Sequence, residues 1–480
     1  MNRKMVFYML GKMLLAEAAM LLLPLTVALY YNEACTSAFL ASIAIILVLA
    51  LPAAVFFKPS NKVIYAKEGF VITALSWLLL SAAGALPFYI SGEISSFTDA
   101  FFETVSGFTT TGASILTDVE AMSRSLLFWR SFTHWIGGMG VLVFLMAIMT
   151  NISDRSMHIM RAEMPGPIVD KLLPRTRDTA KILYLIYLGM TALEIIFLVC
   201  GKMSLFDAIV HTFGTAGTGG FGIKADSIAG YSPYLQWVIT VFMFLFGVNF
   251  NAYYLLLIKR FRAAIKNSEI WAYTAIMCVS TAVITANIYP LYNNFATALR
   301  HSAFQVSSIM TTTGYSTADF DLWPELSKTV LVILMFIGAC AGSTGGGIKV
   351  SRIIIYIKMI RREFSRLLHP RSISIIRLDG KKLEEETIET QGSYLAVYSL
   401  CFFSVFLLLS FDRFDMETNF TAAAACFNNI GPGLSKVGPT LSFAGYSVVS
   451  KLALSFSMLL GRLEIFPLLL AFTPATWVKK

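Results

Sequence analysis

Long apolar blocks without charge recur along this chain, and they restrict it to a helical fold embedded in a membrane. They include Met13–Tyr30, Ala38–Phe57, Phe70–Pro87, Ile182–Cys200 and Leu395–Ser410. A helix needs roughly 20 apolar residues to cross the hydrocarbon core, and by this criterion the sequence contains about ten spans. Only 14% of the 480 residues are charged, too few to solvate a water-facing surface of this size. We therefore expect an all-α integral membrane protein.

Basic and acidic connections alternate between these blocks. Lys and Arg gather mainly in six segments, 1–12, 58–67, 151–181, 259–266, 349–382 and 479–480. Acidic side chains such as Glu93, Asp118 and Asp321 prevail in the other connections. Cytoplasmic loops carry an excess of Lys and Arg, so this pattern places both termini in the cytoplasm. A nucleic-acid-binding surface would be one contiguous basic patch, so nucleic acid is not expected as a partner; the basic segments would instead meet membrane lipids.

Four polar strings that contain glycine lie between longer apolar spans. They are FTTTGAS at 108–114, GTGGF at 217–221, TTTGYST at 311–317 and NNIGP at 428–432. Each follows a stretch of modest hydrophobicity that suits a short helix reaching halfway across the membrane. The key glycines of the four strings are Gly112, Gly220, Gly314 and Gly431. Asp99 and Asp207 stand at the same distance before the first two of them, and we expect these aspartates to cap the start of the short helix.

The repeating unit is therefore a span, a short helix, a polar loop and a second span. Its four copies occupy 69–151, 180–259, 268–363 and 393–475, after an N-terminal pair of spans in 1–57, with a charged cytoplasmic loop expected at 364–392. Irregular backbone at membrane depth is tolerated only against protein or water, and repeats with half-membrane helices are typical of transporters. The predicted fold has four pseudo-symmetric units around one pore, plus two extra N-terminal transmembrane helices.

The four strings have the composition of a site for a dehydrated cation. Rings of backbone carbonyls can replace the hydration shell of an ion, and glycine adopts the required backbone shapes without steric cost. No carboxylate occurs in the strings, which favours a monovalent over a divalent ion. One such string alone would more readily be a tight turn or a helix contact, so the fourfold repetition carries the prediction. The predicted ligating residues are Thr110, Thr111, Gly112, Thr218, Gly219, Gly220, Thr312, Thr313, Gly314, Asn429, Ile430 and Gly431.

Two charged residues lie inside apolar blocks. Lys349 ends a glycine-rich run that makes a continuous helix improbable. This run is either a kink, with Lys349 extending to the membrane surface, or a flexible loop across the pore. Arg462 is expected to face the protein interior or a water-filled path, because a charge at the middle of a span costs ~2.5–3.5 kcal/mol on insertion scales. It either pairs with an acidic neighbour or loop carbonyls, or acts as a fixed positive charge beside the pore. The run consists of Gly342, Ser343, Thr344, Gly345, Gly346 and Gly347, followed by Ile348.

The sequence shows no Ser/His/Asp constellation, no metal-ligand spacing and no nucleotide-binding fingerprint. We therefore expect neither an enzyme nor an organic cofactor; the only expected ligand is a transported monovalent cation.

Motifs after each polar string strengthen this interpretation. They are WRSFTHWIGGMG at 129–140, GVNFNAYY at 247–254, GSTGGGIK at 342–349 and GRLEIF at 461–466. With them, the chain resembles the TrkH/KtrB family of potassium transporters over its full length, and its TrkH-like branch in the extra N-terminal pair. Departures from the family pattern are His134, where Gln is usual, and the pair Thr218-Gly219.

The resemblance implies potassium uptake across a prokaryotic cytoplasmic membrane, with Gly342–Lys349 as an intramembrane gate. It also implies a homodimer and a cytoplasmic nucleotide-binding regulatory ring (TrkA/KtrA-like). A sodium-selective or an Na⁺/K⁺- or H⁺/K⁺-coupled symporter of the same fold is the alternative.

Overall fold

The structure is a computed structural model that describes residues 1–59, 65–140, 176–371 and 375–477. The end of the first predicted repeat (141–151) and most of the basic segment 151–181 lie outside the described residues, as does the C-terminal 479–480. The described part is mostly helical, and its one sheet is an antiparallel pair of two-residue strands, β1 (Arg377–Leu378) and β2 (Lys381–Lys382).

The helices of the described residues fall into five consecutive groups along the chain. The N-terminal group is α1 (Arg3–Met20), α2 (Leu22–Tyr30) and α3 (Thr36–Phe56). The second group is α4 (Ala66–Gly84), α5 (Leu86–Ile90), α6 (Phe97–Phe108) and α7 (Arg124–Gly138). The third group is α10 (Thr176–Cys200), α11 (Leu205–Gly217), α12 (Pro233–Phe246), α13 (Phe250–Leu257) and α14 (Phe261–Ile265). The fourth group is α15 (Ser268–Tyr292), α16 (Phe295–Met310), α17 (Glu325–Ile337) and α18 (Val350–Leu368). The fifth group is α19 (Glu385–Leu409), α20 (Met416–Phe427), α21 (Val448–Arg462), α22 (Phe466–Phe472) and α23 (Pro474–Trp477).

Six helical stretches of the described residues are long and apolar enough to span a membrane, or seven if the bent pair α12–α13 counts as one span. This is fewer than the ten or so spans predicted from hydropathy, in part because the second span is interrupted in the second, third and fourth units of the described chain. The pair α12–α13 bends by 89°, and a non-helical stretch separates α17 from α18. Hydropathy sums over such breaks and cannot detect them.

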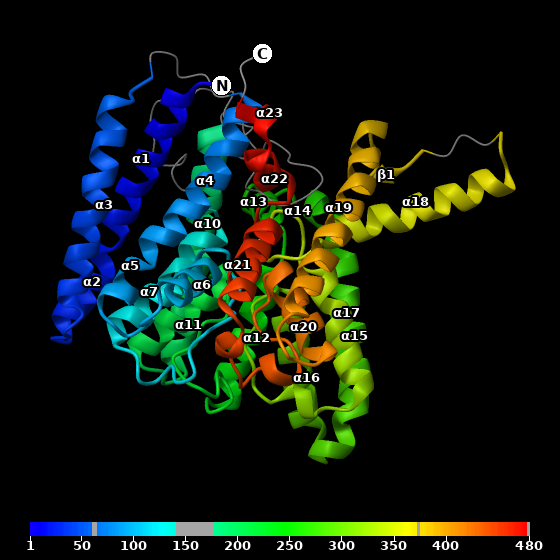
Figure 1. Cartoon of the computed structure of the whole chain (residues 1–480). Coiled ribbons are helices and arrows are strands. Elements are labelled where there is room, and N and C mark those ends of the chain that lie inside the picture. The colour runs from blue at the N-terminus through cyan, green and yellow to red at the C-terminus, as the bar shows by residue number, and fades with distance from the viewer. Residues whose placement is uncertain (60–64, 141–175, 372–374, 478–480) are drawn as a thin grey trace.

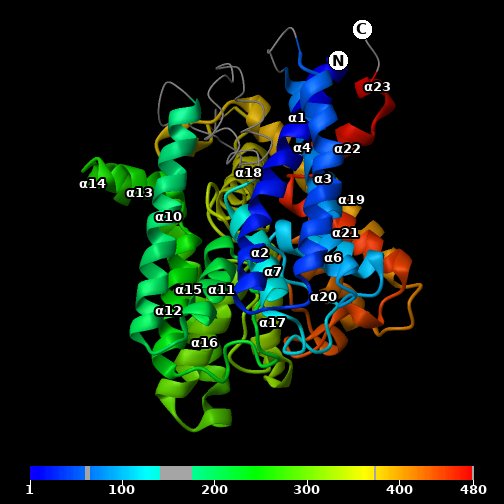
Figure 2. The ribbon, with the colours of Figure 1, turned by 90° about the vertical axis from the view of Figure 1, so that its left-hand side faces the viewer.

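The N-terminal helices pack on the outer flank of the molecule. Figure 1 shows α1 between α3 and α4, and Figures 1 and 2 both show the start of α1 and helix α23 at the same end of the molecule. Helix α3 is covered by the rest of the protein along only a small part of its surface, and large apolar side chains such as Val48, Val55 and Phe56 are exposed. An exposed face this apolar fits hydrocarbon rather than water.

The segment 364–392, predicted to be a loop, holds regular structure at both ends. Helix α18 continues to Leu368 and extends sideways from the body (Figure 1), and α19 already begins at Glu385. The two strands pair between them.

The short helices start differently from the prediction. Ser96 caps α6 by accepting a hydrogen bond from the amide of Asp99, and Ser204 caps α11 by accepting one from the amide of Asp207. The aspartates therefore lie within the first turn, where a carboxylate still favours the positive end of the helix dipole. The expectation that they are the cap residues is wrong, because the preceding serines occupy that position.

Candidate functional site: a ring of four loops

The four polar strings meet in one closed ring. Each key glycine abuts the carbonyl oxygen of the residue that precedes the key glycine of the next string. A Cβ atom on Gly112 would lie 2.0 Å from the oxygen of Gly219, one on Gly220 2.0 Å from that of Thr313, one on Gly314 2.1 Å from that of Ile430, and one on Gly431 2.9 Å from that of Thr111. The order first–second–third–fourth–first closes the ring, so segments more than 300 residues apart in sequence are neighbours.

The backbone of the four strings repeats the same unusual geometry. All four key glycines have positive φ, between 73° and 99°. The residue two places earlier is also left-handed in each string, although none of them is glycine: Thr110 (55°), Thr218 (56°), Thr312 (59°) and Asn429 (57°). Left-handed backbone is strained for residues with a Cβ and clusters at functional sites. Because this conformation recurs at four equivalent positions, we infer that all four strings need the same backbone shape.

The short helices hold the strings by their amides and leave the carbonyls available. In each string the amide before the key glycine donates to a carbonyl near the end of the preceding helix: Thr111 to Ser106 (2.8 Å), Gly219 to Gly214 (2.8 Å), Thr313 to Ser308 (2.8 Å) and Ile430 to Ala425 (2.9 Å). Among the hydrogen bonds between described residues, none ends on the carbonyl oxygens of these four residues. Main-chain oxygens without a protein partner are suited to bind a cation.

Side chains stabilise the strings and also join two of them. Within the first string, the hydroxyls of Thr109 and Thr111 lie 2.8 Å apart. The Asn429 amide donates to the Thr111 hydroxyl (2.9 Å) and to the carbonyl of Met458 (2.9 Å), so it closes the ring between the fourth and first strings.

Replacing Asn429 with threonine, the residue that has the same left-handed backbone in the other three strings, removes the amide that donates both hydrogen bonds without enlarging the side chain. We expect the variant to fold and to lose about fivefold in its preference for K⁺ over Na⁺, since a net hydrogen bond is worth about 1 kcal/mol. Paired K⁺ and Na⁺ flux measurements in vesicles check this. An unchanged preference would show that the side chain does not help to shape the ring.

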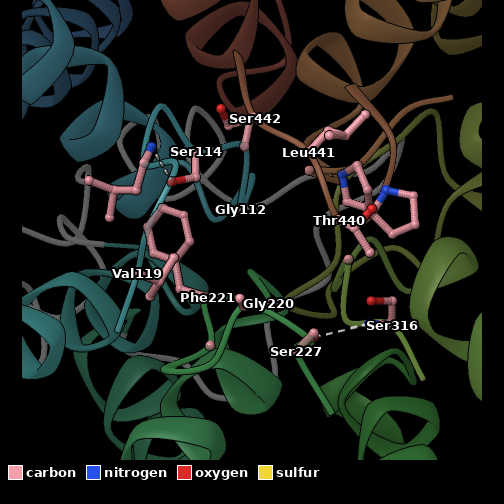
Figure 3. A pocket seen from close by; sticks show the side chains of 18 of the residues that line it. Gly112, Ser114, Val119, Gly220, Phe221, Ser227, Ser316, Thr440, Leu441 and Ser442 are labelled. Atoms are coloured by element: carbon pink, nitrogen blue, oxygen red, sulfur yellow. Dashed lines mark hydrogen bonds between the residues drawn. The ribbon is translucent and has the colours of Figure 1, made fainter. Parts of the chain in front are cut away.

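An open cavity of about 230 Å³ lies on the side of the ring lined by residues that follow the key glycines. Figure 3 shows Gly112 and Gly220 at its wall, with Ser114, Ser316 and Ser442 around it. Gly314 and Gly431 also line the cavity, so all four strings contribute to it. The charged residues that line it are Arg130 and Lys224.

The glycine-rich run lies on the opposite side of the ring. Helix α17 ends at Ile337 and α18 begins at Val350, so Gly338–Lys349 is a loop rather than a kinked helix. The amide of Gly346 donates to the Thr312 hydroxyl (2.6 Å), directly beneath the third string. The Gly342 carbonyl accepts from the amide of Phe250 (3.0 Å), at the break between α12 and α13. We call Gly338–Lys349 the crossing loop.

Lys349 and Arg462 both hold the crossing loop from within the protein. Lys349 is 1% exposed and donates to the carbonyl of Gly345, so it does not extend to the membrane surface. Arg462 is 5% exposed and donates to the carbonyls of Thr344 (2.9 Å), Gly138 (2.7 Å) and Gly137. Arg462 therefore bonds to carbonyls rather than to an acidic neighbour, and its role as a positive charge beside the pore stays a prediction. The acidic neighbour, Glu464, pairs with Arg352 instead.

One residue that anchors the crossing loop was missed from the sequence. The Glu269 carboxylate, in the first turn of α15, accepts from the amides of Ala341 (2.7 Å) and Ser351 (3.0 Å), at either end of the loop. An acidic residue at the start of an apolar span resembles a helix cap, and its second role depends on contacts across 72 and 82 residues.

The two departures from the family pattern are in contact with each other. The His134 ring stacks on Phe221 with centroids 4.1 Å apart. A Cβ on Gly219 would lie 2.4 Å from the His134 ring, so glycine at this position makes room for the imidazole. Side-chain packing behind the second string therefore links the two departures.

The chain matches the TrkH family model, described as "Cation transport protein", over residues 36–273 and 274–478. Among the described residues, no group of three or more His, Cys, Asp or Glu could hold a metal ion.

Curated proteins and a solved structure are similar over the whole length. The chain is 35% identical to the Trk system potassium uptake protein TrkH of Salmonella typhimurium strain LT2, covering 99% of this chain and 100% of that one. It is 32% identical to the potassium uptake protein TrkG of Escherichia coli K12, covering 99% and 98%. The crystal structure of the potassium transporter TrkH from Vibrio parahaemolyticus superimposes with a TM-score of 0.90 at 32% identity, covering 100% of both chains.

Proposed function

The chain belongs to the TrkH family of cation transport proteins, and from this premise we propose that it carries potassium into the cell through the ring of four loops. The prediction that it is a transporter rather than an enzyme is confirmed by the names of relatives such as the potassium uptake proteins TrkH of Salmonella typhimurium and Escherichia coli. The finer layout we propose is four pseudo-symmetric units around one pore, with α1–α3 as the extra N-terminal helices.

The observation that carries this proposal is the closed cycle of glycines and carbonyls. A cation that crosses the bilayer must exchange its water for equivalent oxygens, and the four strings supply main-chain oxygens on one ring. The short helices α6, α11, α16 and α20 end at the ring, so their partial negative charge favours a cation there. The ring is neutral, which suits the weakly hydrated K⁺ better than a divalent ion. We therefore assign the twelve predicted residues of the four strings to the selectivity filter.

The crossing loop is the gate of this proposal. It lies against the third string through Thr312 and against the break in the second unit through Phe250. Its glycines Gly338, Gly342 and Gly347 have positive φ, and few side chains restrict its backbone. A loop held by reversible hydrogen bonds can move without unfolding a helix.

The location and partners follow from the family and the charge pattern. We propose a cytoplasmic membrane location with both termini inside, a homodimer, and control by a cytoplasmic nucleotide-binding ring. Anionic lipid headgroups would contact the basic residues on the same face.

A flux measurement tests the proposal. The purified chain in lipid vesicles is expected to carry K⁺ and Rb⁺ down their gradients, and Na⁺ several-fold more slowly. A pH gradient without a K⁺ gradient should drive no K⁺ flux. Faster Na⁺ than K⁺ flux would support the sodium-selective alternative, and K⁺ flux that requires Na⁺ or H⁺ would support a symporter. Absence of any cation flux would contradict the proposal.

A further inference from the structure

Beside the ring lies a buried ion pair for which the proposed function has so far given no role. The Nε atom of Arg130, in α7, donates to the Glu103 carboxylate of α6 at 2.6 Å. The two residues are 3% and 1% exposed. A buried pair of this kind adds little net stability compared with an apolar pair, so its presence calls for another explanation.

Both members of the pair hold residues that follow a key glycine. The Glu103 carboxylate accepts from the Ser114 hydroxyl (2.9 Å), at the end of the first string, and from the amide of the next residue, Ile115 (3.0 Å). The Arg130 guanidinium donates to the carbonyl of Gly222 (3.1 Å), the residue directly after the second string. Its centre also lies 3.5 Å from the centroid of the Phe221 ring. The pair therefore connects the first string to the second through charged hydrogen bonds.

The other short helices carry different residues at the equivalent position. Counting back from each key glycine, Glu103 corresponds to His211, Gln305 and Ala422. His211 contacts the Tyr231 hydroxyl (3.1 Å), and neither polar atom of the Gln305 amide has a hydrogen-bond partner among the described residues. Of the four equivalent positions, which all lie in the described residues, only that of Glu103 therefore contributes an ion pair, and this pair lies at the junction between the first and second strings.

That junction also lacks a side chain immediately before the key glycine of its second string. Its second string contributes Gly219 and Gly220 in succession, where the third contributes Thr313 and Gly314. The Thr313 hydroxyl contacts that of Thr311 at 2.8 Å, a contact that Gly219 cannot make. Backbone with two consecutive glycines has more conformations available, so an external clamp has most effect here.

We propose that Glu103 and Arg130 form a positioning clamp that fixes the spacing of the first and second strings and thereby sets the K⁺ over Na⁺ preference of the ring. The inference rests on the proposed function. Neither side chain needs to touch the ion. Because Arg130 also lines the cavity, Glu103 additionally neutralises a positive charge that would otherwise face arriving cations.

Arg130→Lys separates geometry from charge. Lysine keeps the positive charge, but it has neither the planar fork that reaches Glu103 and Gly222 together nor a flat group to cover Phe221. We expect the K⁺/Na⁺ flux ratio to fall about tenfold or more, the effect of losing roughly one hydrogen bond to a charged group. K⁺ flux itself should stay within about threefold of the parent, because the charge of the cavity is unchanged. Arg413→Lys, at an exposed site, is the matched control and should leave the ratio unchanged.

The measurement uses the full chain in vesicles, with the parent protein in the same series. If the parent carries K⁺ selectively and folded Arg130→Lys keeps its ratio, the clamp is refuted while the proposed function stands. If the parent carries no cation, the proposed function itself fails. Should Arg130→Lys not fold, Ser114→Ala decides, because it removes only the hydroxyl that Glu103 holds. A lower ratio in that variant supports the clamp, and an unchanged ratio overturns it.

Discussion

Gly220→Ala is expected to abolish selective potassium flux. A Cβ at this position would lie 2.0 Å from the carbonyl oxygen of Thr313, a distance at which the neighbouring backbone must move. The φ of Gly220 is +73°, so alanine would also strain its own backbone. Since the displaced oxygen belongs to the ring, we expect K⁺ flux to fall at least tenfold, or the K⁺/Na⁺ ratio to approach one, as expected for backbone strain of about 1–3 kcal/mol.

Gly189→Ala is the matched control for this substitution. Gly189 lies in α10, its φ is not positive, and nothing lies within 4 Å of the Cβ that alanine would add. The same flux assay should give the parent value for this variant. If Gly220→Ala were equally unaffected in folded protein, the ring would not be the path of the ion.

Arg462→Gln is expected to raise K⁺ flux. The guanidinium donates to the crossing loop at Thr344 and to the end of α7 at Gly137 and Gly138, so it fastens the loop in the observed position. Each hydrogen bond from a charged donor is worth about 1.5–3 kcal/mol, and losing them should shift the loop toward open arrangements about tenfold or more. Removing a positive charge near the path lowers the barrier for cations in the same direction.

The control for this variant is Arg413→Gln, at an exposed site. Initial rates of Rb⁺ uptake into vesicles, normalised to the amount of folded protein, provide the measurement. Flux and ion preference that match the parent would exclude Arg462 from both gating and the barrier. Lower flux with the same preference would mean that Arg462 supports the open arrangement instead.

The repeating features of the chain could be predicted from its sequence. The four strings share a glycine, polar neighbours and a preceding short helix, and the cycle from Gly112 to Gly431 brings these strings together. Repetition is detectable because each copy supports the others. The interruption of the helix around Gly342–Gly347 could be predicted for a different reason, since consecutive glycines disfavour a continuous helix.

Features that depend on contacts between distant residues could not be predicted. The bend between Phe246 and Phe250 lies in an apolar block that hydropathy treats as continuous. The role of Glu269 as an anchor requires the crossing loop to fold back onto α15. Arg462 and Glu464 are close in sequence, yet Arg462 bonds to carbonyls and Glu464 pairs with Arg352, 112 residues away. Partner choice for a buried charge is decided by packing, which local sequence does not encode.

Thallium bound to crystals of the full chain offers the most direct measurement of where the ion is coordinated. Tl⁺ substitutes for K⁺ in size and charge and gives a strong anomalous signal. If the main-chain oxygens of the four strings replace the water of a dehydrated cation, an anomalous peak should lie on the axis of the ring, at the level of Thr111, Gly219, Thr313 and Ile430. A ring without a peak, with thallium bound elsewhere along the chain, would contradict the claim that these oxygens coordinate the ion.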